Sequence, residues 1–212
     1  VTRSVTRRLT SRFAEVWQRE NLEGRVLHRD LLAAPPPLVN EGWIAAAFAE
    51  PEKRTQTMTE ALAASEELIR EVEAADVIVI GTPMYNFGMP AALKAYFDQI
   101  IRVGRTFAFD PDREEPYSPL LKPKLVVVIT SVGDGSLLPG GDLAHLNFLE
   151  PHLQTTLGFV GLADVRFVRV GYEEFQDGRL RRLLGEAEAA VDALAAEKRV
   201  AASSPDLALA AA

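Results

Sequence analysis

The sequence contains no cysteine. This absence excludes disulfides, thiolate zinc sites, iron–sulfur ligation and thiol nucleophiles, and it fits a reducing compartment, so we expect a cytoplasmic protein. Histidine is scarce: His28, His145 and His152 are scattered, and Pro151 separates the last two. Because no carboxylate pattern completes a set of ligands, we expect no metal site.

Long apolar runs are also missing. The longest strongly apolar segment covers residues 125–129, far short of the roughly 20 residues that a membrane helix requires. Acidic side chains outnumber basic ones, and the formal net charge is -7. A surface of that sign repels phosphate backbones. We therefore expect neither a membrane nor a nucleic acid as a partner.

What the chain does contain is an alternation of helix and strand patterns, in a length that suits one α/β domain. Strands separated by helices of this length predict βαβ units and a parallel sheet. We expect a single domain over residues 1–200 and a disordered, alanine-rich tail over residues 201–212. The periodicity predicts helices over 4–20, 41–49, 56–74, 90–103, 147–160 and 179–198, and strands over 25–30, 76–81, 124–130 and 164–170.

The loops that follow two of these strands are the first candidates for a site, because parallel sheets bind ligands beyond the carboxyl ends of their strands. Residues 81–90 run from a strand directly into a helix, whose start presents N–H groups and positive charge. Tyr85 and Phe87 offer flat apolar surfaces, and Asn86 offers a donor and an acceptor. These residues suit a planar heteroaromatic ligand with a polar edge. On spacing alone, an ordinary proline-stiffened turn fits equally well.

Five segments together are typical of a known family. They are Pro83-Met-Tyr-Asn-Phe87, Leu93-Lys-Ala-Tyr-Phe-Asp98, Gly104-Arg-Thr-Phe107, Thr130-Ser-Val-Gly133 and Leu157-Gly-Phe-Val-Gly161. In the order and spacing of these segments, residues 4–197 resemble FMN-dependent NADH azoreductases and NAD(P)H quinone reductases. The resemblance implies a flavodoxin-like three-layer α/β sandwich with a parallel sheet, FMN as the cofactor, and NADH or NADPH as the electron donor.

The resemblance also implies roles for single residues. Ser4, Val5 and Thr6 would hold the FMN phosphate, although helix capping uses the same atoms and is favoured where the resemblance is set aside. Two further sets would hold the flavin ring: Met84, Tyr85, Asn86 and Phe87 in contact with it, and Ser131, Val132, Gly133 and Asp134 along its pyrimidine side.

Phe109 and Phe159 match positions where the family places the aromatic walls of its substrate pocket, and we assign Phe87 of the flavin loop to the same pocket. Phe159 fits a core position equally well. The implied reaction passes electrons from NAD(P)H to a quinone or azo compound by ping-pong hydride transfer. Since the flavin carries the chemistry, no protein residue is expected to be catalytic. The resemblance further implies a homodimer with the pocket near the subunit interface.

Two other functions stay open. A flavodoxin-type electron carrier, or a flavin-binding module without its own substrate, would oxidise NADH slowly. A non-catalytic α/β interaction protein would bind no flavin. The aromatic positions favour the enzyme, because a carrier has less need of a walled pocket.

The sequence departs from the family at its start. The family's opening strand and its Ser-Pro-Arg-like phosphate loop have no counterpart before Ser4. In the flavodoxin-like strand order 2-1-3-4-5 the first strand is central, so without it two strands would lack a neighbour and expose their edges. We hypothesise that the sequence is incomplete at its N-terminus or has a mis-assigned start.

A second departure generates a prediction. Residues 132–134 are Val-Gly-Asp, where the family commonly has Arg-Gly-Gly. A carboxylate at the pyrimidine edge disfavours the anionic reduced flavin. We therefore expect Asp134→Gly to raise the flavin reduction potential, measured by redox titration of the FMN-loaded protein. An unchanged potential would show that the Asp134 side chain points elsewhere.

Overall fold

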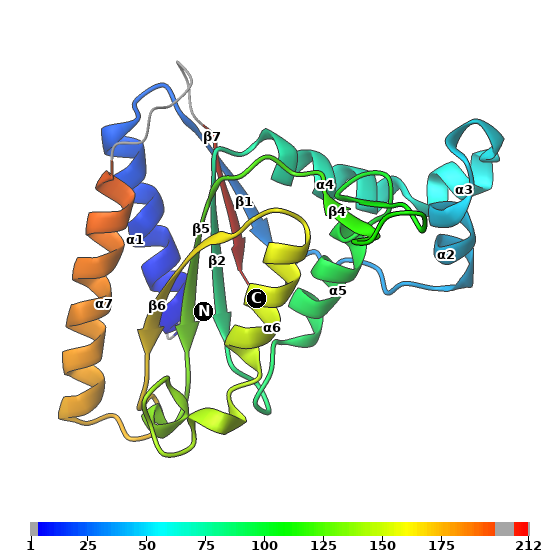
Figure 1. Cartoon of the computed structure of the whole chain (residues 1–212). Helices are drawn as coiled ribbons and strands as arrows, with labels where there is room; N and C mark the ends of the chain where they lie inside the picture. Colours follow the sequence, from blue (N-terminus) through cyan, green and yellow to red (C-terminus); the bar gives the residue numbers. More distant parts are fainter. Residues whose placement is uncertain (1–3, 198–205, 212) are drawn as a thin grey trace.

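Five parallel strands form the centre of the molecule (Figure 1). The computed structural model describes residues 4–197 and 206–211, and every neighbouring pair of these strands is parallel. The predicted parallel sheet is therefore confirmed. In sheet order the strands are β1 (Arg25–Asp30), β7 (Asp206–Ala211), β2 (Val77–Pro83), β5 (Leu125–Ser131) and β6 (Asp164–Val170).

Helices cover both faces of this sheet, as the predicted three-layer sandwich requires (Figure 1). One face carries α1 (Val5–Glu20) and α7 (Gly178–Ala196). The other carries α4 (Ala63–Ala74), α5 (Ala91–Ile100) and α6 (Leu149–Phe159). No helix within the described ranges is both long and apolar enough to span a bilayer.

The two layers of the core follow from the strand sequences. β2 and β5 are nearly continuous runs of β-branched and aliphatic residues, the pattern of strands buried on both faces. Alternate side chains therefore enter different cores. Ile78, Ile80, Val126 and Val128 pack with α4, α5 and α6, whereas Val77, Val79, Leu125, Val127 and Ile129 pack with α1 and α7.

Two short helices, α2 (Glu41–Phe48) and α3 (Gln56–Ala61), lie beyond α5 at the side of the sandwich (Figure 1), with a turn of 3₁₀ helix, η1 (Pro51–Lys53), between them. Trp43 anchors α2, since its indole N–H donates to the buried Gln99 side chain at 2.9 Å. The single helix predicted over 56–74 is interrupted at Leu62, whose side chain is buried in the small cluster around Trp43.

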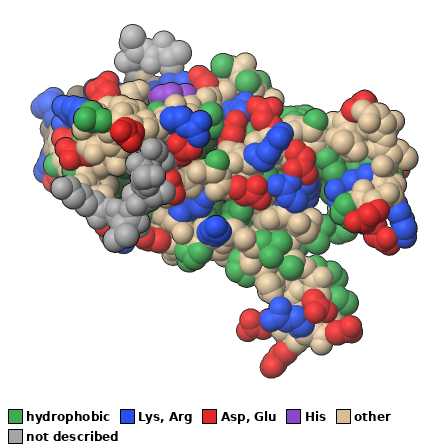
Figure 2. All heavy atoms as spheres, turned by 90° about the horizontal axis from the view of Figure 1, so that it is seen from above, with side chains coloured by type: hydrophobic (Ala, Val, Ile, Leu, Met, Phe, Trp, Pro, Cys, Tyr) green, Lys and Arg blue, Asp and Glu red, His purple; other side chains and the backbone are tan. Residues whose placement is uncertain are grey.

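A short antiparallel hairpin was not predicted. Its strands are β3 (Phe107–Phe109) and β4 (Tyr117–Pro119), which are too short for alternation to be recognised in the sequence. Figure 2 shows the hairpin as a projection with acidic and basic side chains at its tip and apolar side chains near its base. Two further turns of 3₁₀ helix are η2 (Gly135–Leu137) and η3 (Ala144–Leu146).

β7 occupies the central position that we expected to be empty. It lies between β1 and β2 in register with both, so that Leu209 is opposite His28 on one side and Val79 on the other. The predicted disordered tail is therefore wrong for residues 206–211, and the predicted loss of neighbours for β1 and β2 does not occur. Residues 201–205 and 212 of that tail lie outside the described residues.

The physical reason for this error lies in the alternation of leucine with alanine along β7. Leu207 and Leu209 are buried in the core beneath α1 and α7, while Ala208 packs against the opposite core. Asp206 fixes the start of the strand, because its carboxylate accepts two hydrogen bonds from Arg25, at 2.6 and 3.1 Å. Small and mid-sized side chains suit a strand between two helix layers, and an alanine-rich composition hides this pattern.

Leu209→Ala tests the position of β7. Leu209 is 5% exposed, so its truncation should lower the free energy of unfolding by about 2–4 kcal/mol, the usual cost of emptying such a position. Urea denaturation followed by circular dichroism measures this value. Leu22→Ala is the control, because Leu22 is 85% exposed and should change stability by less than about 0.5 kcal/mol. Equal stability of the two variants would show that β7 is not packed in the sheet.

Candidate functional site

Two loops leave the sheet side by side at the carboxyl ends of β2 and β5. The strands end in register, with Pro83 opposite Ser131. The amide of Met84 then donates to the Ser131 carbonyl at 2.8 Å, which extends the pairing by one bond into the loops. The predicted segments 84–87 and 131–134 are therefore neighbours in space.

The first turn of α1 reaches the same edge because Gly81 has no side chain. A Cβ at Gly81 would lie 2.6 Å from the Thr10 methyl group and 3.5 Å from the Thr6 carbonyl. Ser4 caps this helix: its hydroxyl accepts from the Arg7 amide at 3.3 Å and lies 3.3 Å from the Thr6 hydroxyl. The first turn contains no acidic residue, so its positive end is not neutralised from within the helix.

The loop after β2 is a strained turn that displays aromatic rings. Tyr85 and Gly88 exchange both backbone hydrogen bonds at 3.0 Å. Asn86 and Phe87 between them have φ values of 46° and 70°, the left-handed region that such two-residue turns require and that favours Asn and Gly. A phenylalanine there is unfavourable. Yet the rings of Tyr85 and Phe87 are 60% and 48% exposed, so burial does not explain the strain.

Phe148 extends this aromatic surface. Its amide donates to the Phe87 carbonyl at 3.0 Å, and its ring is exposed at the start of α6. The Asn147 side chain accepts from the Glu150 amide, in the first turn of the same helix, at 3.1 Å. Sequence reasoning missed Phe148, because the carboxyl-edge rule indicates loops that follow strands and Phe148 precedes a helix.

The loop after β5 is held close to the loop after β6 by two glycines. A Cβ on Gly133 would lie 2.2 Å from the Glu174 carboxylate, and one on Gly135 would lie 2.4 Å from the Tyr172 ring. Tyr172 itself has a φ of 66°, which turns the chain back after β6. The two loops therefore pack without room for additional side-chain atoms.

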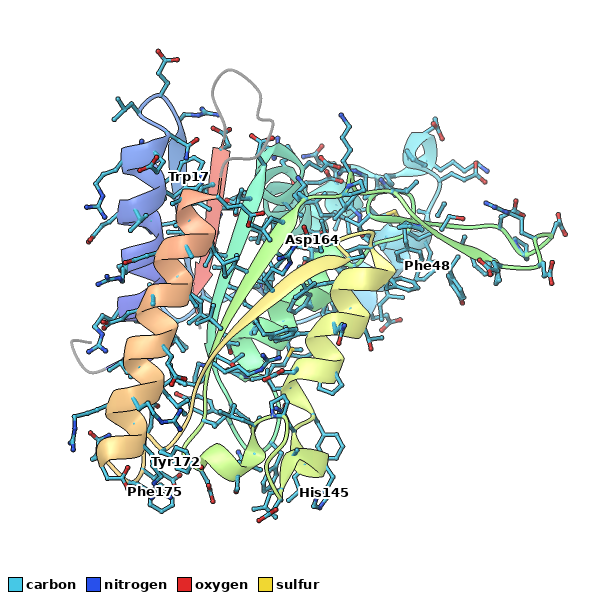
Figure 3. The ribbon with its side chains drawn as sticks, turned by 60° about the vertical axis from the view of Figure 1, so that its left-hand side comes forward. Trp17, Phe48, His145, Asp164, Tyr172 and Phe175 are labelled. Carbon is cyan, nitrogen blue, oxygen red and sulfur yellow. The ribbon has the colours of Figure 1, made fainter. Side chains whose placement is uncertain are left out.

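Asp134 stays within its own loop. Its carboxylate accepts from the Ser136 amide at 2.9 Å and caps η2. This hydrogen bond lowers the pKa of Asp134, and the nearby charge of Arg179 acts in the same direction. Arg179 is held against the rings of Tyr172 and Phe175, at 4.3 and 4.5 Å from their centroids. Figure 3 shows these two rings together at the lower end of the molecule, near the start of α7.

Two hydroxyl groups at this edge are buried without a hydrogen-bond partner, on Thr130 at the end of β5 and on Ser136 in the loop after it. A buried hydroxyl without a partner is unfavourable, and a ligand with polar atoms relieves it. With the helix start at Ser4, the exposed rings and the backbone amides of the loops, these groups match the parts of FMN: an anionic phosphate, a polyol chain and a flat ring with a polar edge.

Two of the predicted substrate-pocket residues lie elsewhere. Phe159 ends α6, and its ring lies 4.9 Å from that of Phe107 and 5.6 Å from that of Tyr117. Phe109 belongs to the same hairpin cluster, 5.2 Å from Tyr117. Phe87, by contrast, lies beside the start of α6. One copy of the chain therefore does not bring the three phenylalanines together.

Glu173 is a further residue that sequence reasoning missed. An adjacent acidic pair such as Glu173 and Glu174 is ordinarily a pair of solvated charges, but Glu173 is half-buried in the loop after β6. The same carboxyl-edge rule, applied to the strand that ends at Val170, would have indicated it. Within the described part of the chain, no group of three or more His, Cys, Asp or Glu side chains has the geometry of a metal site.

Comparison with known proteins identifies similar chains. The family described as flavodoxin-like fold matches residues 1–193. An FMN-dependent NADH:quinone oxidoreductase of Opitutus terrae is 55% identical over 192 residues, which cover 91% of this chain and 90% of the relative. An FMN-dependent NADH:quinone oxidoreductase 2 of Idiomarina loihiensis is 40% identical, over 92% of this chain and 81% of the relative.

Solved structures agree in fold. An azoreductase from Bacillus anthracis str. Sterne matches with a TM-score of 0.81 at 20% sequence identity, over 92% of each chain. At this identity the similarity concerns the arrangement of helices and strands, and the flavodoxin-like architecture predicted from the sequence is confirmed.

The strained turn generates a prediction for the protein without ligand. Replacing Phe87 by glycine should raise the free energy of unfolding by roughly 1 kcal/mol, because glycine adopts a positive φ without strain. Phe87→Ala is the matched control, since it removes the ring and keeps the Cβ that causes the strain. Guanidinium denaturation of the FMN-free variants measures both values. If the alanine variant is as stable as the glycine variant, the turn is not strained.

Proposed function

We propose that this chain, which belongs to the family of FMN-dependent NADH:quinone oxidoreductases within the flavodoxin-like fold, passes electrons from NADH or NADPH to a quinone or an azo compound. The resemblance inferred from the sequence is confirmed by the relatives. The observation that carries the proposal is the carboxyl edge of the sheet. There, a helix start, two exposed rings on a strained turn and two partnerless hydroxyls lie at the same end of the sheet.

In this proposal the chain holds FMN from three sides. The hydroxyls of Ser4 and Thr6 and the amides of the first α1 turn, Val5 included, bind the phosphate. The loop after β2 supports the flavin ring through Met84, Tyr85, Asn86 and Phe87, and Ser131, Val132, Gly133 and Asp134 line the pyrimidine side. Bound FMN supplies the two-electron chemistry, and no protein side chain is required as a nucleophile.

The chain's own contribution is position and exclusion of water. Phe87 and Tyr85 present flat apolar surfaces at the open side of the edge, where donor and acceptor take turns. One pocket used twice implies ping-pong kinetics. The proposal places the reaction in the cytoplasm, in keeping with a chain without cysteine, and includes neither nucleic acid nor membrane as a partner.

A homodimer is part of the proposal, because one copy separates the aromatic walls. The 11 residues of α6 span about 16 Å at 1.5 Å per residue, with Phe87 beside the start of the helix and Phe159 at its end. We propose that the hairpin cluster around Phe109 and Phe159 of one copy covers the FMN edge of the other.

An exposed apolar surface near the hairpin supports this arrangement. Phe48 on α2 is 75% exposed and lies on the side of the molecule that carries the hairpin (Figure 3), and Figure 2 shows apolar side chains gathered near the hairpin base. A surface of this kind in a globular protein indicates a partner. The exposed large apolar side chains of α2, of the hairpin and of the residue that follows it are Ile44, Phe48, Phe109, Tyr117 and Leu120.

The visible spectrum of the purified protein with added FMN tests the function. We expect two flavin bands that bleach on addition of NADH without oxygen and return on addition of a quinone. Bound flavin that stays oxidised would favour an electron carrier, and absence of bound flavin would contradict the proposal. Initial rates at several concentrations of donor and acceptor should give parallel double-reciprocal lines, and intersecting lines would contradict the ping-pong order.

Sedimentation velocity tests the dimer. We expect twice the mass of one chain for the native protein and a single-chain mass for Phe48→Asp, because a charge buried in an apolar interface is unfavourable. Phe48→Asp should still bind FMN and should lose most of its quinone turnover. A single-chain mass for the native protein with full turnover would refute the shared pocket.

A further inference from the structure

Glu173 lies against the loop after β5, which is the proposed pyrimidine side of the FMN site. Its amide is directed at the Val132 carbonyl at 3.4 Å, and the next amide, of Glu174, donates to the Gly133 carbonyl at 3.2 Å. The positive φ of Tyr172, 66°, turns the backbone back after β6 so that it runs beside the loop after β5. The backbone at Glu173 is therefore held beside two residues of the proposed site.

The Glu173 side chain is directed into the same edge. The Ser131 hydroxyl, on the last residue of β5, lies near enough to this carboxyl to lower its pKa. Ser131 alternates with Val127 and Ile129, whose side chains enter the core beneath α1 and α7. By this alternation the Ser131 hydroxyl and its carboxyl partner are on the sheet face that carries α1, whose start is the proposed phosphate site.

No cation neutralises this carboxyl. On α7, Arg179 pairs with Asp177 at 2.8 Å, and on α1, Arg7 pairs with Asp30 at 2.6 Å. Two further charged groups in the neighbouring loops are themselves acidic. Asp134 caps η2, and Glu174 is exposed to solvent. Within the part of the chain that the structure describes, no lysine or arginine forms an ion pair with Glu173.

We propose that Glu173 sets the affinity for FMN according to pH: its neutral carboxyl favours binding, and its ionised carboxylate opposes it. This inference rests on the proposed function and concerns a residue to which that function assigns no role. A neutral carboxyl donates a hydrogen bond, whereas a carboxylate only accepts. A carboxylate at a site for an anionic ligand also adds like-charge repulsion.

The surroundings of the carboxyl favour its neutral form. Burial raises the pKa of Glu173, and the nearby Ser131 hydroxyl offsets part of that rise. An anionic ligand in the site raises the pKa further, so FMN binding takes up protons. The affinity is then highest below the pKa of the free protein and falls as the pH rises through it.

Flavin fluorescence quenching measures the dissociation constant of FMN between pH 5.5 and 8.5 for the native protein and for Glu173→Gln. Glutamine keeps the size and a donor and removes the charge. The second ionisation of the phosphate, near pH 6, is common to both proteins, so their ratio isolates the carboxyl. Glu174→Gln is the matched control: its carboxylate lies against Gly133 of the same loop, but unlike that of Glu173 it is exposed to solvent.

We expect the ratio of the native dissociation constant to that of Glu173→Gln to rise with pH, about tenfold for each unit by which bound FMN raises the carboxyl pKa. Glu174→Gln should follow the native protein. The melting temperature without FMN gives a second measurement: Glu173→Gln should exceed the native protein at pH 8 and not at pH 4.

A constant ratio across the pH range, with FMN bound by both proteins, would overturn the role of Glu173 and leave the proposed function intact. The same rise for Glu174→Gln would overturn the assignment to Glu173. If the native protein binds no FMN at any pH in the range, the proposed function fails, and this inference fails with it.

Discussion

The burial of β2 on both faces and along both edges is the constraint on which the rest of the structure depends. Its backbone groups have no access to water, so each needs a partner within the sheet. β5 supplies those partners on one side and β7 on the other. Because β2 and β5 end in register at Pro83 and Ser131, their loops leave the sheet together. Gly81 then lets the start of α1 reach the same place, so strand pairing and this one glycine together account for the position of the site.

What β2 requires of β7, its second neighbour, is mainly backbone hydrogen-bond partners. A strand in the central position needs free N–H and C=O groups on both sides and side chains that fit between two helix layers. The alternating Leu207-Ala208-Leu209-Ala210 meets both conditions, although this segment lies outside residues 1–193, over which the family matches. These conditions require no particular side-chain chemistry, so a segment of ordinary composition satisfies them.

The same distinction explains which features were predictable from sequence. Local periodicity indicates the helices and the strands β1, β2, β5 and β6, and the position of residues 84–87 after a buried strand indicates that loop. β7, the hairpin of β3 and β4, and the helix break at Leu62 depend on contacts between segments distant in the sequence. Local sequence patterns do not show such contacts. In the site, Glu173 and Glu174 look in sequence like any exposed acidic pair, and only the fold shows that Glu173 lies beside Val132. The separation of Phe87 from Phe159 likewise follows from the length of α6. A short sequence motif does not show this separation.

The unfavourable features of the fold are concentrated at the carboxyl edge. The four non-glycine residues with positive φ in the described chain are all there, Asn86 and Phe87 in one turn and Tyr172 and Gln176 in the loop after β6. Two of the three buried polar atoms without partners in the described residues belong to Thr130 and Ser136, and the uncompensated carboxyl of Glu173 is adjacent. A fold selected for stability alone would remove each of them by a single substitution, glycine for strain or an apolar residue for an unpaired hydroxyl. Their coincidence at one edge, beneath exposed aromatic rings, is expected where binding of a ligand, rather than folding, satisfies these groups.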